Sequence, residues 1–306
     1  MSDLPRAVCI AGPTGTGKSA AALRLAAELG GEVINADSRQ VYADFPLITA
    51  QPGPEALRLH PHHLYGFLGA AEGINAGQWA GLAAAKVAEC AARGKLPLLV
   101  GGTGLYIRAI TRGMAEIPPV DPAVAQRLEE EYLRQGPQAL HARLAKADPS
   151  YAARTPARNR QRVLRALGVW ECTGRPFSWW HGQGGGRPLC RALLLVARAE
   201  LGELVPRLER RINAMLEGGA LDEARLALAR CADPAAPGWS GIGCAELRRH
   251  LRGEISLEQA RALWLANTRA YAKRQLTWFR GQRDAVWVEA SDHDDLLRKA
   301  RVFLRS

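Results

Sequence analysis

The segment "AGPTGTGKSA", residues 11–20, has residue types and a spacing that can bind phosphate groups. A glycine, four further residues and then Gly-Lys-Ser make the pattern of a phosphate-binding loop. Its glycines let successive backbone N–H groups point inward, while Lys18 reaches the terminal phosphates and the Ser19 hydroxyl can hold magnesium. We therefore expect a nucleotide or diphosphate ligand, with magnesium on Ser19, at the residues Gly12, Pro13, Thr14, Gly15, Thr16, Gly17, Lys18 and Ser19.

One carboxylate stands beside this loop. The strand "EVINAD" ends on Asp37, which is well placed to take a proton from a nucleophile that approaches the bound phosphates. The alternative for Asp37 is a cap or turn residue. A triphosphatase generally has an acidic residue directly after a second apolar strand. Neither "LPLLV" nor "CRALLLV" is followed directly by a carboxylate in this chain. Two chemistries remain, a small-molecule kinase and the transfer of a carbon group from a diphosphate.

The elements around these residues alternate between strand and helix. "RAVCIAG" enters the loop and "KSAAALRLAAEL" leaves it, and strands at 32–37 and 96–102 flank a helix from about 78 to 93. Residues 190–196 and 285–288 read as further strands, with a long helix at about 256–280. This alternation predicts a doubly wound parallel sheet whose functional residues lie at the carboxyl ends of the strands.

The middle of the chain has a different pattern. Between "IPPVDP" and the glycine-rich "GQGGGRP" the periodicity is helical, from residue 121 to about 173. We therefore predict an α/β fold, with a P-loop doubly wound parallel sheet core at residues 1–117 and 185–306. An all-helical insertion domain at residues 118–184 is expected to interrupt it.

Composition and cysteine usage exclude several classes of protein. Of 306 residues, 47% are hydrophobic, a share typical of globular chains rather than disordered ones. No early segment reads as a signal peptide, and no stretch approaches the roughly 18 apolar residues of a membrane span. We expect a cytoplasmic protein without a membrane partner. Six scattered cysteines predict neither a disulfide framework nor a zinc site, and "HPHH" at 60–63 reads as a proline-ordered turn.

The net charge of +11 is unevenly distributed. Residues 151–190 hold seven arginines against one acid, and residues 264–283 hold five basic residues and no acid. Basic residues grouped in this way, with aromatic residues among them, are typical of a nucleic-acid binder. The alternative is a solvated basic face without a partner.

Five segments together resemble the tRNA dimethylallyltransferase family, also called the tRNA isopentenyltransferases. They are "GPTGTGKS", "INADSRQVY", "LPLLVGGTGLY", "RNRQRVLRALGVWECTG" and "NTRAYAKRQLTWFR", and they run from residue 12 to residue 280 in the family's order. The resemblance implies transfer of a dimethylallyl group from dimethylallyl diphosphate to the exocyclic amine of the adenosine on the 3′ side of the tRNA anticodon. It favours prenyl transfer over a small-molecule kinase and over a non-catalytic RNA-binding protein. One continuous site needs no second chain, so we expect a monomer.

The resemblance also implies roles for individual residues. Asp37 is the expected general base, and the Thr103 hydroxyl is expected to fix the target base, a helix N-cap being its alternative. Arg207 matches an arginine that reaches the diphosphate, with Arg211 as the fallback. The expected contacts to the tRNA anticodon stem-loop are Asp37, Ser38, Arg39, Gln40, Thr103, Gln161, Arg162, Val163, Leu164, Arg165, Lys273, Arg274, Gln275, Trp278 and Arg280.

Two segments depart from the family's pattern. The chain has "FPLITAQP" at 45–52 where the family has "DIGTAKP", and "GIGCAEL" at 241–247 where the family has a Gly-Tyr-Arg/Lys stretch. Contacts from 45–52 and from 240–246 are therefore left open, whereas the loop and Asp37 are unaffected.

Overall fold

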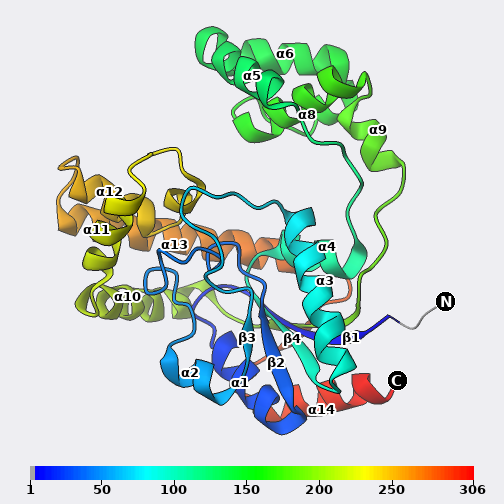
Figure 1. The fold of residues 1–306 in the computed structure, drawn as a ribbon, viewed down its shortest axis with the longest axis vertical. Coiled ribbons are helices and arrows are strands. Elements are labelled where there is room, and N and C mark those ends of the chain that lie inside the picture. The colour runs from blue at the N-terminus through cyan, green and yellow to red at the C-terminus, as the bar shows by residue number, and fades with distance from the viewer. Residues whose placement is uncertain (1–3) are drawn as a thin grey trace. The chain divides into compact units, whose positions relative to one another are not determined.

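A six-stranded sheet forms the centre of the larger of two compact units in the computed structural model, which describes residues 4–306 (Figure 1). Its strand order is β3-β2-β4-β1-β5-β6, and every pairing is parallel. The predicted doubly wound sheet is thus confirmed. The strands are β1 (Arg6–Ala11), β2 (Gly31–Asn35), β3 (His62–His63), β4 (Leu96–Gly101), β5 (Arg191–Ala197) and β6 (Val286–Val288).

Helices cover both faces of this sheet, which explains why its central strands are apolar at successive positions. Along β1, Val8 and Ile10 pack with α1 (Lys18–Leu29) and α14 (His293–Arg305) on one face. Cys9 and Ala11 pack with α3 (Ala76–Ala92) and α4 (Gly104–Arg112) on the other. The chain runs from β1 to β2 on one side of β1, and after β4 it crosses to β5 on the other side, so the carboxyl end of β1 is the switch point where a doubly wound fold binds its ligand.

A second hydrophobic cluster of the larger unit lies among its later helices. It joins α10 (Leu201–Glu217), α11 (Ala220–Arg230), the 3₁₀ turn η1 (Pro237–Ser240), α12 (Cys244–Leu251) and α13 (Leu257–Arg280). The ring of Phe45 packs edge-on against Trp239, with 4.9 Å between their centroids. The segment 45–52, which departs from the family's pattern, is therefore anchored in this cluster near the short helix α2 (Pro54–Leu59).

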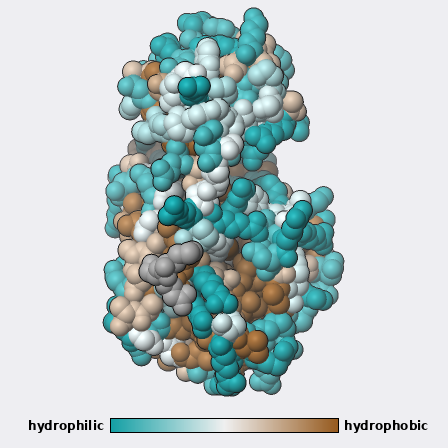
Figure 2. Space-filling view, turned by 90° about the vertical axis from the view of Figure 1, so that its right-hand side faces the viewer, coloured by the Kyte–Doolittle hydropathy of each residue, from teal (hydrophilic) through white to brown (hydrophobic). Residues whose placement is uncertain are grey.

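The second unit, Arg112–Arg187, is all helical in the described chain. Its helices are α5 (Pro122–Gln135), α6 (Pro137–Ala147), α7 (Pro149–Ala152), α8 (Arg160–Thr173) and α9 (Phe177–Gly182). Leu128, Leu144 and Leu167 are fully buried in a core of its own. The predicted domain boundaries, 118 and 184, both fall inside this unit. Hydrophilic and near-neutral residues cover most of its surface on the face shown in Figure 2.

Two elements lie outside what the sequence pattern predicts. His62 and His63 form an edge strand that pairs with Val33 and Ile34, so the prediction of a turn there is wrong for these two residues. A two-residue strand is too short to show a period of two. The C-terminal helix α14 was not expected either, although Leu296 and Ala300 bury one side of it against α1.

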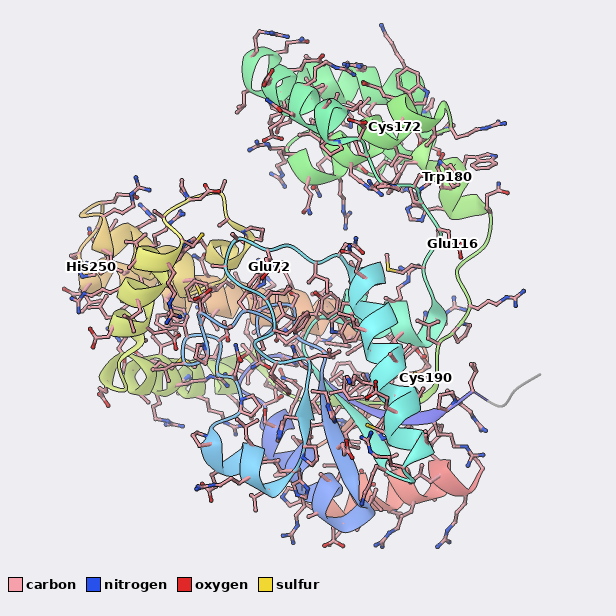
Figure 3. All side chains as sticks on the ribbon, in the orientation of Figure 1. Glu72, Glu116, Cys172, Trp180, Cys190 and His250 are labelled. Atoms are coloured by element: carbon pink, nitrogen blue, oxygen red, sulfur yellow. The ribbon has the colours of Figure 1, made fainter. Side chains whose placement is uncertain are left out.

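The six cysteines are all free. Cys9, Cys90, Cys190 and Cys244 are buried, whereas Cys172 on α8 is exposed (Figure 3). Most of them serve as small core residues, in line with a chain held together without disulfides. Among the residues described, no helix is long and apolar enough to cross a membrane.

Candidate active site

The phosphate-binding loop joins β1 to α1 at the carboxyl edge of the sheet. Gly17 has φ +86°, in the left-handed region that glycine adopts without strain, and it is the N-cap of α1. Within residues 4–306, no side chain caps this helix. The first backbone amides of α1 are therefore available to bind an anion, which the positive end of the helix dipole also attracts.

Lys18 is held inside the loop. Its ammonium donates to the carbonyl of Pro13, which also accepts from the Thr16 hydroxyl at 3.0 Å. Burial lowers the pKa of Lys18 to about 8, with Asp37 opposing the shift and Arg211 adding to it. Lys18, Asp37 and Arg211 are thus electrostatic neighbours, two cations around one carboxylate.

Asp37 is oriented by a residue that the sequence reasoning missed. The fully buried amide of Asn35 accepts from the Asp37 N–H at 2.8 Å and donates to the Asp37 carbonyl at 3.0 Å. One Asp37 carboxylate oxygen accepts from the Arg39 N–H at 2.9 Å. The other makes no hydrogen bond with residues 4–306, which leaves it able to accept a proton. Asn35 ends strand β2 two residues before Asp37, and that position was the available signal.

A cavity of about 330 Å³ opens beside Asp37. Part of its lining is polar and includes Thr14, Asp37, Arg211 and Arg274. The apolar part of the lining consists of Ile48, Leu208, Ile212, Met215, Ile242 and Trp264. A ligand with a charged end and a small apolar end therefore fits the distribution of polarity. The two segments that depart from the family's pattern contribute Ile48, Thr49, Ser240 and Ile242 to the same cavity.

Thr103 connects this cavity to the end of β4. Its hydroxyl accepts from the Ser38 N–H at 2.9 Å and donates to the Ser38 hydroxyl at 3.2 Å. Only its backbone carbonyl bonds to the first turn of α4, so its side chain is not used as a helix cap. Tyr271, which was not predicted, lines the cavity and hydrogen-bonds to Thr103, while burial raises the Tyr271 pKa to about 12.

The two candidate arginines border the loop from different cavities. Arg211 is half-buried in the cavity that holds Asp37, and burial lowers its pKa. Arg207 is exposed and lines a second cavity of about 650 Å³, together with Gly15, Gly17 and Arg198. Both side chains therefore lie beside the loop, Arg211 on the side of the carboxylate.

The predicted tRNA contacts of the larger unit divide into exposed and internal side chains. Lys273, Arg274 and Arg280 are exposed along α13, whereas Trp278 is half-buried against the core. Gln275 is 4% exposed and bonded at both ends of its amide, which corrects the expectation that it contacts tRNA. The Arg39 guanidinium donates to the Ser240 hydroxyl at 2.7 Å.

Gln40 is likewise engaged internally. Its amide donates to the carbonyls of Thr49 and Ala50 at 2.9 and 2.7 Å. This side chain therefore holds the 49–50 backbone in place beside the site, and the structure does not present it to a nucleotide. Ser38, in contrast, lines the 330 Å³ cavity directly.

In the helical unit, only some of the residues predicted to contact tRNA are exposed. Gln161 and Arg162 are exposed on α8 and Leu164 is half-buried. Arg165 is half-buried and donates to the Pro118 carbonyl at 3.0 Å. Val163 is fully buried in the unit's core, so the expectation that its side chain contacts tRNA is corrected. A helix cannot expose five successive residues, because its side chains turn about 100° per residue.

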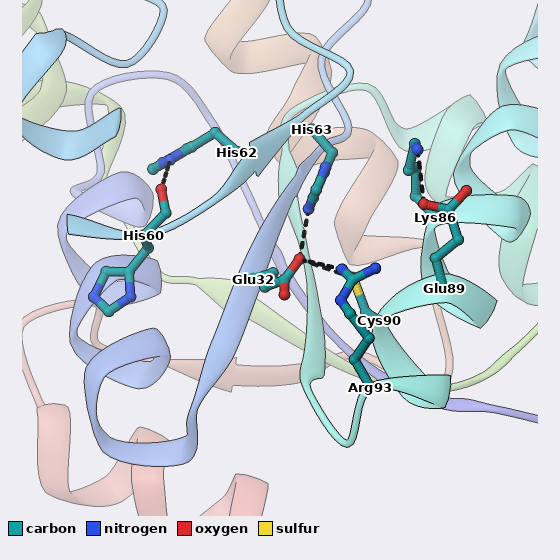
Figure 4. A network of polar contacts seen from close by, with 8 residues as sticks. All are labelled: Glu32, His60, His62, His63, Lys86, Glu89, Cys90 and Arg93. Atoms are coloured by element: carbon teal, nitrogen blue, oxygen red, sulfur yellow. Dashed lines mark hydrogen bonds and ion pairs between the residues drawn. The ribbon is translucent and has the colours of Figure 1, made fainter. Parts of the chain in front are cut away.

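A further polar network lies around Glu32 on β2 (Figure 4). One Glu32 oxygen accepts from His63 at 2.7 Å, from Arg93 at 2.8 Å and from the Cys90 thiol at 3.4 Å. Burial raises the Glu32 pKa, but these hydrogen bonds outweigh burial and hold it below its usual value. Glu32, His63 and Cys90 are metal-ligand types within 4.8 Å of one another. With Arg93 on the carboxylate, however, the network is satisfied as a buried ion pair that ties β2, β3 and α3 together.

Comparisons with known proteins show the family of this chain. A sequence model of the family described as IPP transferase matches residues 40–282, and one described as isopentenyl transferase matches residues 5–61. A tRNA dimethylallyltransferase of Desulfovibrio desulfuricans is 56% identical over 297 residues, covering 97% of this chain and 92% of the relative. One from Rhodopseudomonas palustris is 47% identical over 296 residues, covering 96% and 92%.

Solved structures are similar over the same extent. The full-length tRNA isopentenylpyrophosphate transferase of Bacillus halodurans has a TM-score of 0.71 at 33% identity, covering 98% of this chain and 96% of that one. A eukaryotic dimethylallyltransferase acting on tRNA has a TM-score of 0.81 at 27% identity, covering 97% of this chain and 77% of that one. With its phosphate loop, its carboxylate and these relatives, the chain belongs to the IPP transferase family, the family of the tRNA dimethylallyltransferases.

Proposed function

We propose that this protein transfers a dimethylallyl group from dimethylallyl diphosphate to the exocyclic amine of the adenosine on the 3′ side of a tRNA anticodon, and releases diphosphate. The observation that carries the proposal is one cavity that combines the Asp37 carboxylate, Thr14 of the phosphate loop and an apolar wall. Those features match a base, a diphosphate and a five-carbon apolar group. The names of the relatives, tRNA dimethylallyltransferases, support the same reaction.

The chemistry needs a base at the position of Asp37. The exocyclic amine of adenine is a poor nucleophile, because its lone pair is delocalised into the ring. As its nitrogen bonds to the carbon that carries the diphosphate, the C–O bond breaks and the diphosphate leaves with the electron pair. The amine proton passes to the free carboxylate oxygen of Asp37, which lowers the energy of the transition state.

The phosphate loop stabilises the leaving group. The departing diphosphate gains negative charge, and the first amides of α1 and the Lys18 ammonium are arranged to receive it. Arg207 and Arg211 border the loop from two sides and are the proposed guanidinium contacts. Arg211 lines the same cavity as the Asp37 carboxylate.

Ser19 fits a magnesium ligand. It lines a cavity of about 220 Å³ with Gln51 and Tyr65, and its hydroxyl makes no hydrogen bond within residues 4–306. A hydroxyl that is open to solvent at this position of the loop is the donor that such sites use. We propose that Ser19 would hold magnesium, which when bound would supply positive charge to stabilise the leaving group.

The exposed basic side chains supply a tRNA surface. An adenine must leave its stacked position to enter a closed site, and phosphate contacts fix the nucleotide around it. Lys273, Arg274 and Arg280 on α13, and Arg162 on α8, are exposed and suited to these contacts. One complete cavity in one chain supports a monomer, and a tRNA substrate supports the expected cytoplasmic location.

Three parallel incubations test the proposal. The first contains unmodified tRNA and labelled dimethylallyl diphosphate, the second tRNA and labelled ATP, and the third labelled diphosphate alone. We expect label in tRNA in the first tube, released by nuclease as one modified adenosine, and no ATP consumed in the second. Consumption of ATP without prenylated tRNA would support a kinase instead, and tRNA binding without either reaction would support a non-catalytic RNA-binding protein.

A further inference from the structure

The amide of Gln275 joins two segments of the active site that lie far apart in the chain. Gln275 is on α13 and is 4% exposed. Its oxygen accepts from the Thr14 N–H at 3.1 Å, and its nitrogen donates to the Gly102 carbonyl at 3.0 Å. Thr14 belongs to the phosphate loop after β1, and Gly102 directly precedes Thr103 after β4. One buried side chain thus bridges the diphosphate segment and the segment that borders the nucleotide cavity.

The peptide group between Pro13 and Thr14 is held at both ends. Its N–H is bound by Gln275, and its carbonyl accepts from the Thr16 hydroxyl and the Lys18 ammonium. A peptide group is planar, so the direction of its N–H also sets the direction of its carbonyl. Gln275 therefore determines where the ammonium of Lys18 rests in the loop.

The Gln275 amide packs closely against the backbone of Gly102. A Cβ at residue 102 would overlap the side-chain nitrogen of Gln275, so glycine is needed there for the amide to approach. Both polar ends of Gln275 are paired. Removal of this side chain would leave a partly buried N–H on Thr14 and a buried carbonyl on Gly102 without these partners, which proteins avoid.

We infer that Gln275 is a positioning residue for the diphosphate, although it does not itself touch the reacting atoms. It fixes the Pro13–Thr14 peptide, and through that peptide Lys18, in the orientation that receives the diphosphate, and it keeps the loop aligned with Thr103. Without Gln275 this peptide can rotate and aim its carbonyl into the loop, where its partial negative charge opposes a phosphate. The inference rests on the proposed diphosphate substrate.

Three variants test this role in the full-length protein. Gln275→Met is close in length but loses both hydrogen bonds. Gln275→Glu has nearly the same shape and keeps an acceptor for Thr14, but when ionised it cannot donate to Gly102. Gln282→Met is the control, because Gln282 lies beyond the end of α13 and its side-chain amide donates only to the Trp278 carbonyl among the described residues. The readout is the Kd for inorganic diphosphate with magnesium, measured by calorimetry without tRNA.

We expect Gln275→Met to raise the diphosphate Kd at least tenfold, while its Kd for tRNA stays within twofold of the wild type. For Gln282→Met, both Kd values should stay within twofold of the wild type. The KM for dimethylallyl diphosphate should rise more than kcat falls. Gln275→Glu provides a rescue, since a protonated carboxyl can donate to Gly102 while it accepts from Thr14. The diphosphate Kd of Gln275→Glu, divided by that of the wild type, should therefore decrease as the pH falls from 8 to 6. The same ratio for Gln275→Met should stay constant.

Other outcomes overturn the role. If Gln275→Met is folded by circular dichroism and binds diphosphate within twofold of the wild type, Gln275 does not position the loop. If Gln275→Met does not fold, the pH series of Gln275→Glu decides, and a ratio that does not change with pH overturns the inference. Diphosphate binding is measured here without transfer, so a failed prenylation assay with normal diphosphate binding would count against the proposed function alone.

Discussion

At the scale of single residues, the proposed base, Asp37, is oriented by neighbours to which no chemical role is assigned. Asn35 fixes the backbone of Asp37 on both sides, and the Arg39 N–H binds one carboxylate oxygen. Asp37 lines a cavity together with Arg211, and both Lys18 and Arg211 interact electrostatically with its carboxylate. The proposed base thus has cations near it without a direct ion pair among the described residues.

The isosteric change Asp37→Asn tests the base. The amide keeps an acceptor for the Arg39 N–H but cannot take the amine proton, so single-turnover transfer should fall by about 100-fold or more. Affinity for tRNA should change by less than about twofold, because charge-driven contacts lie elsewhere. Asp222→Asn, an exposed carboxylate on α11, is the control. Transfer within threefold of the wild type would rule out Asp37 as the base.

The pKa of Lys18 predicts a pH dependence of diphosphate binding. Burial lowers this pKa to about 8, so the ammonium of the free protein loses its proton as the pH rises through that value. Diphosphate affinity should fall by up to about tenfold per pH unit above 8, since only the charged form attracts the ligand. Lys18→Arg keeps its charge over this range.

The matched measurement is the ratio of the diphosphate Kd values of the two proteins between pH 7 and pH 9.5. Titration of the diphosphate itself affects both proteins equally and cancels in the ratio. Identical pH profiles for wild type and Lys18→Arg would show that the charge of Lys18 does not govern binding.

At the scale of elements, α8 and α13 each divide their residues between a buried side and a basic exposed side. On α13, Gln275 and Phe279 are buried while Lys273, Arg274 and Arg280 are exposed. On α8, Val163 and Leu167 build the core of the helical unit, and Arg162 remains exposed. In both helices the apolar side holds the element in place, so the charged side can meet a phosphate backbone without loss of packing.

The salt dependence of tRNA binding tests the basic side of α8. Replacing Arg162 and Arg165 together with alanine should weaken binding and reduce the slope of log affinity against log salt by roughly one to two. Arg162 should account for most of this change, because the Arg165 guanidinium already donates to the Pro118 carbonyl. Diphosphate affinity should not change, since the diphosphate site belongs to the other unit.

Filter binding of each single variant and of the double variant at several salt concentrations measures the slope. Arg134→Ala, at an exposed arginine on α5 of the same unit, removes the same charge as each single variant and serves as their control. A slope equal to that of the wild type in the double variant would mean that these arginines are a solvated face.

At the scale of the whole molecule, a buried ion pair supports the sheet away from the proposed chemistry. Glu32 joins β2 to His63 on β3 and to Arg93 at the end of α3, and its side chain is only 7% exposed. Its pKa is lower in the folded protein than its usual value. Its carboxylate therefore adds stability that is fully present above the unfolded pKa and is lost as the pH falls through the folded pKa.

Glu32→Gln should accordingly lower the free energy of unfolding by about 1–3 kcal/mol at neutral pH, because the charged hydrogen bonds of the carboxylate are lost. The difference in the free energy of unfolding between the wild type and Glu32→Gln should be the same at pH 7 and pH 5. It should become smaller below the unfolded Glu pKa of about 4.3. Urea unfolding curves across this range measure it, with Glu89→Gln, an exposed carboxylate on α3, as the control. A deficit that widens in acid would contradict the assigned pKa direction.

The local sequence was enough to predict the loop, the carboxylate and the parallel sheet. A phosphate loop is contiguous, so the spacing of Gly12, Gly17 and Lys18 carries its geometry. The alternation of strands and helices specifies parallel pairing, because a parallel strand requires a crossover connection. Asp37 could be placed at the carboxyl edge by the same reasoning, since it follows the apolar strand β2.

Only the tertiary structure decided what the remaining polar side chains do. Gln275 reaches a loop 261 residues away, and Tyr271 reaches Thr103, because α13 packs against the carboxyl edge of the sheet. Val163 and Arg162 are neighbours in one motif, yet the helix turns one into the core and the other outward. Motif matching treats such residues alike. Whether a polar side chain binds the ligand or holds the backbone depends on long-range packing, which local spacing does not contain.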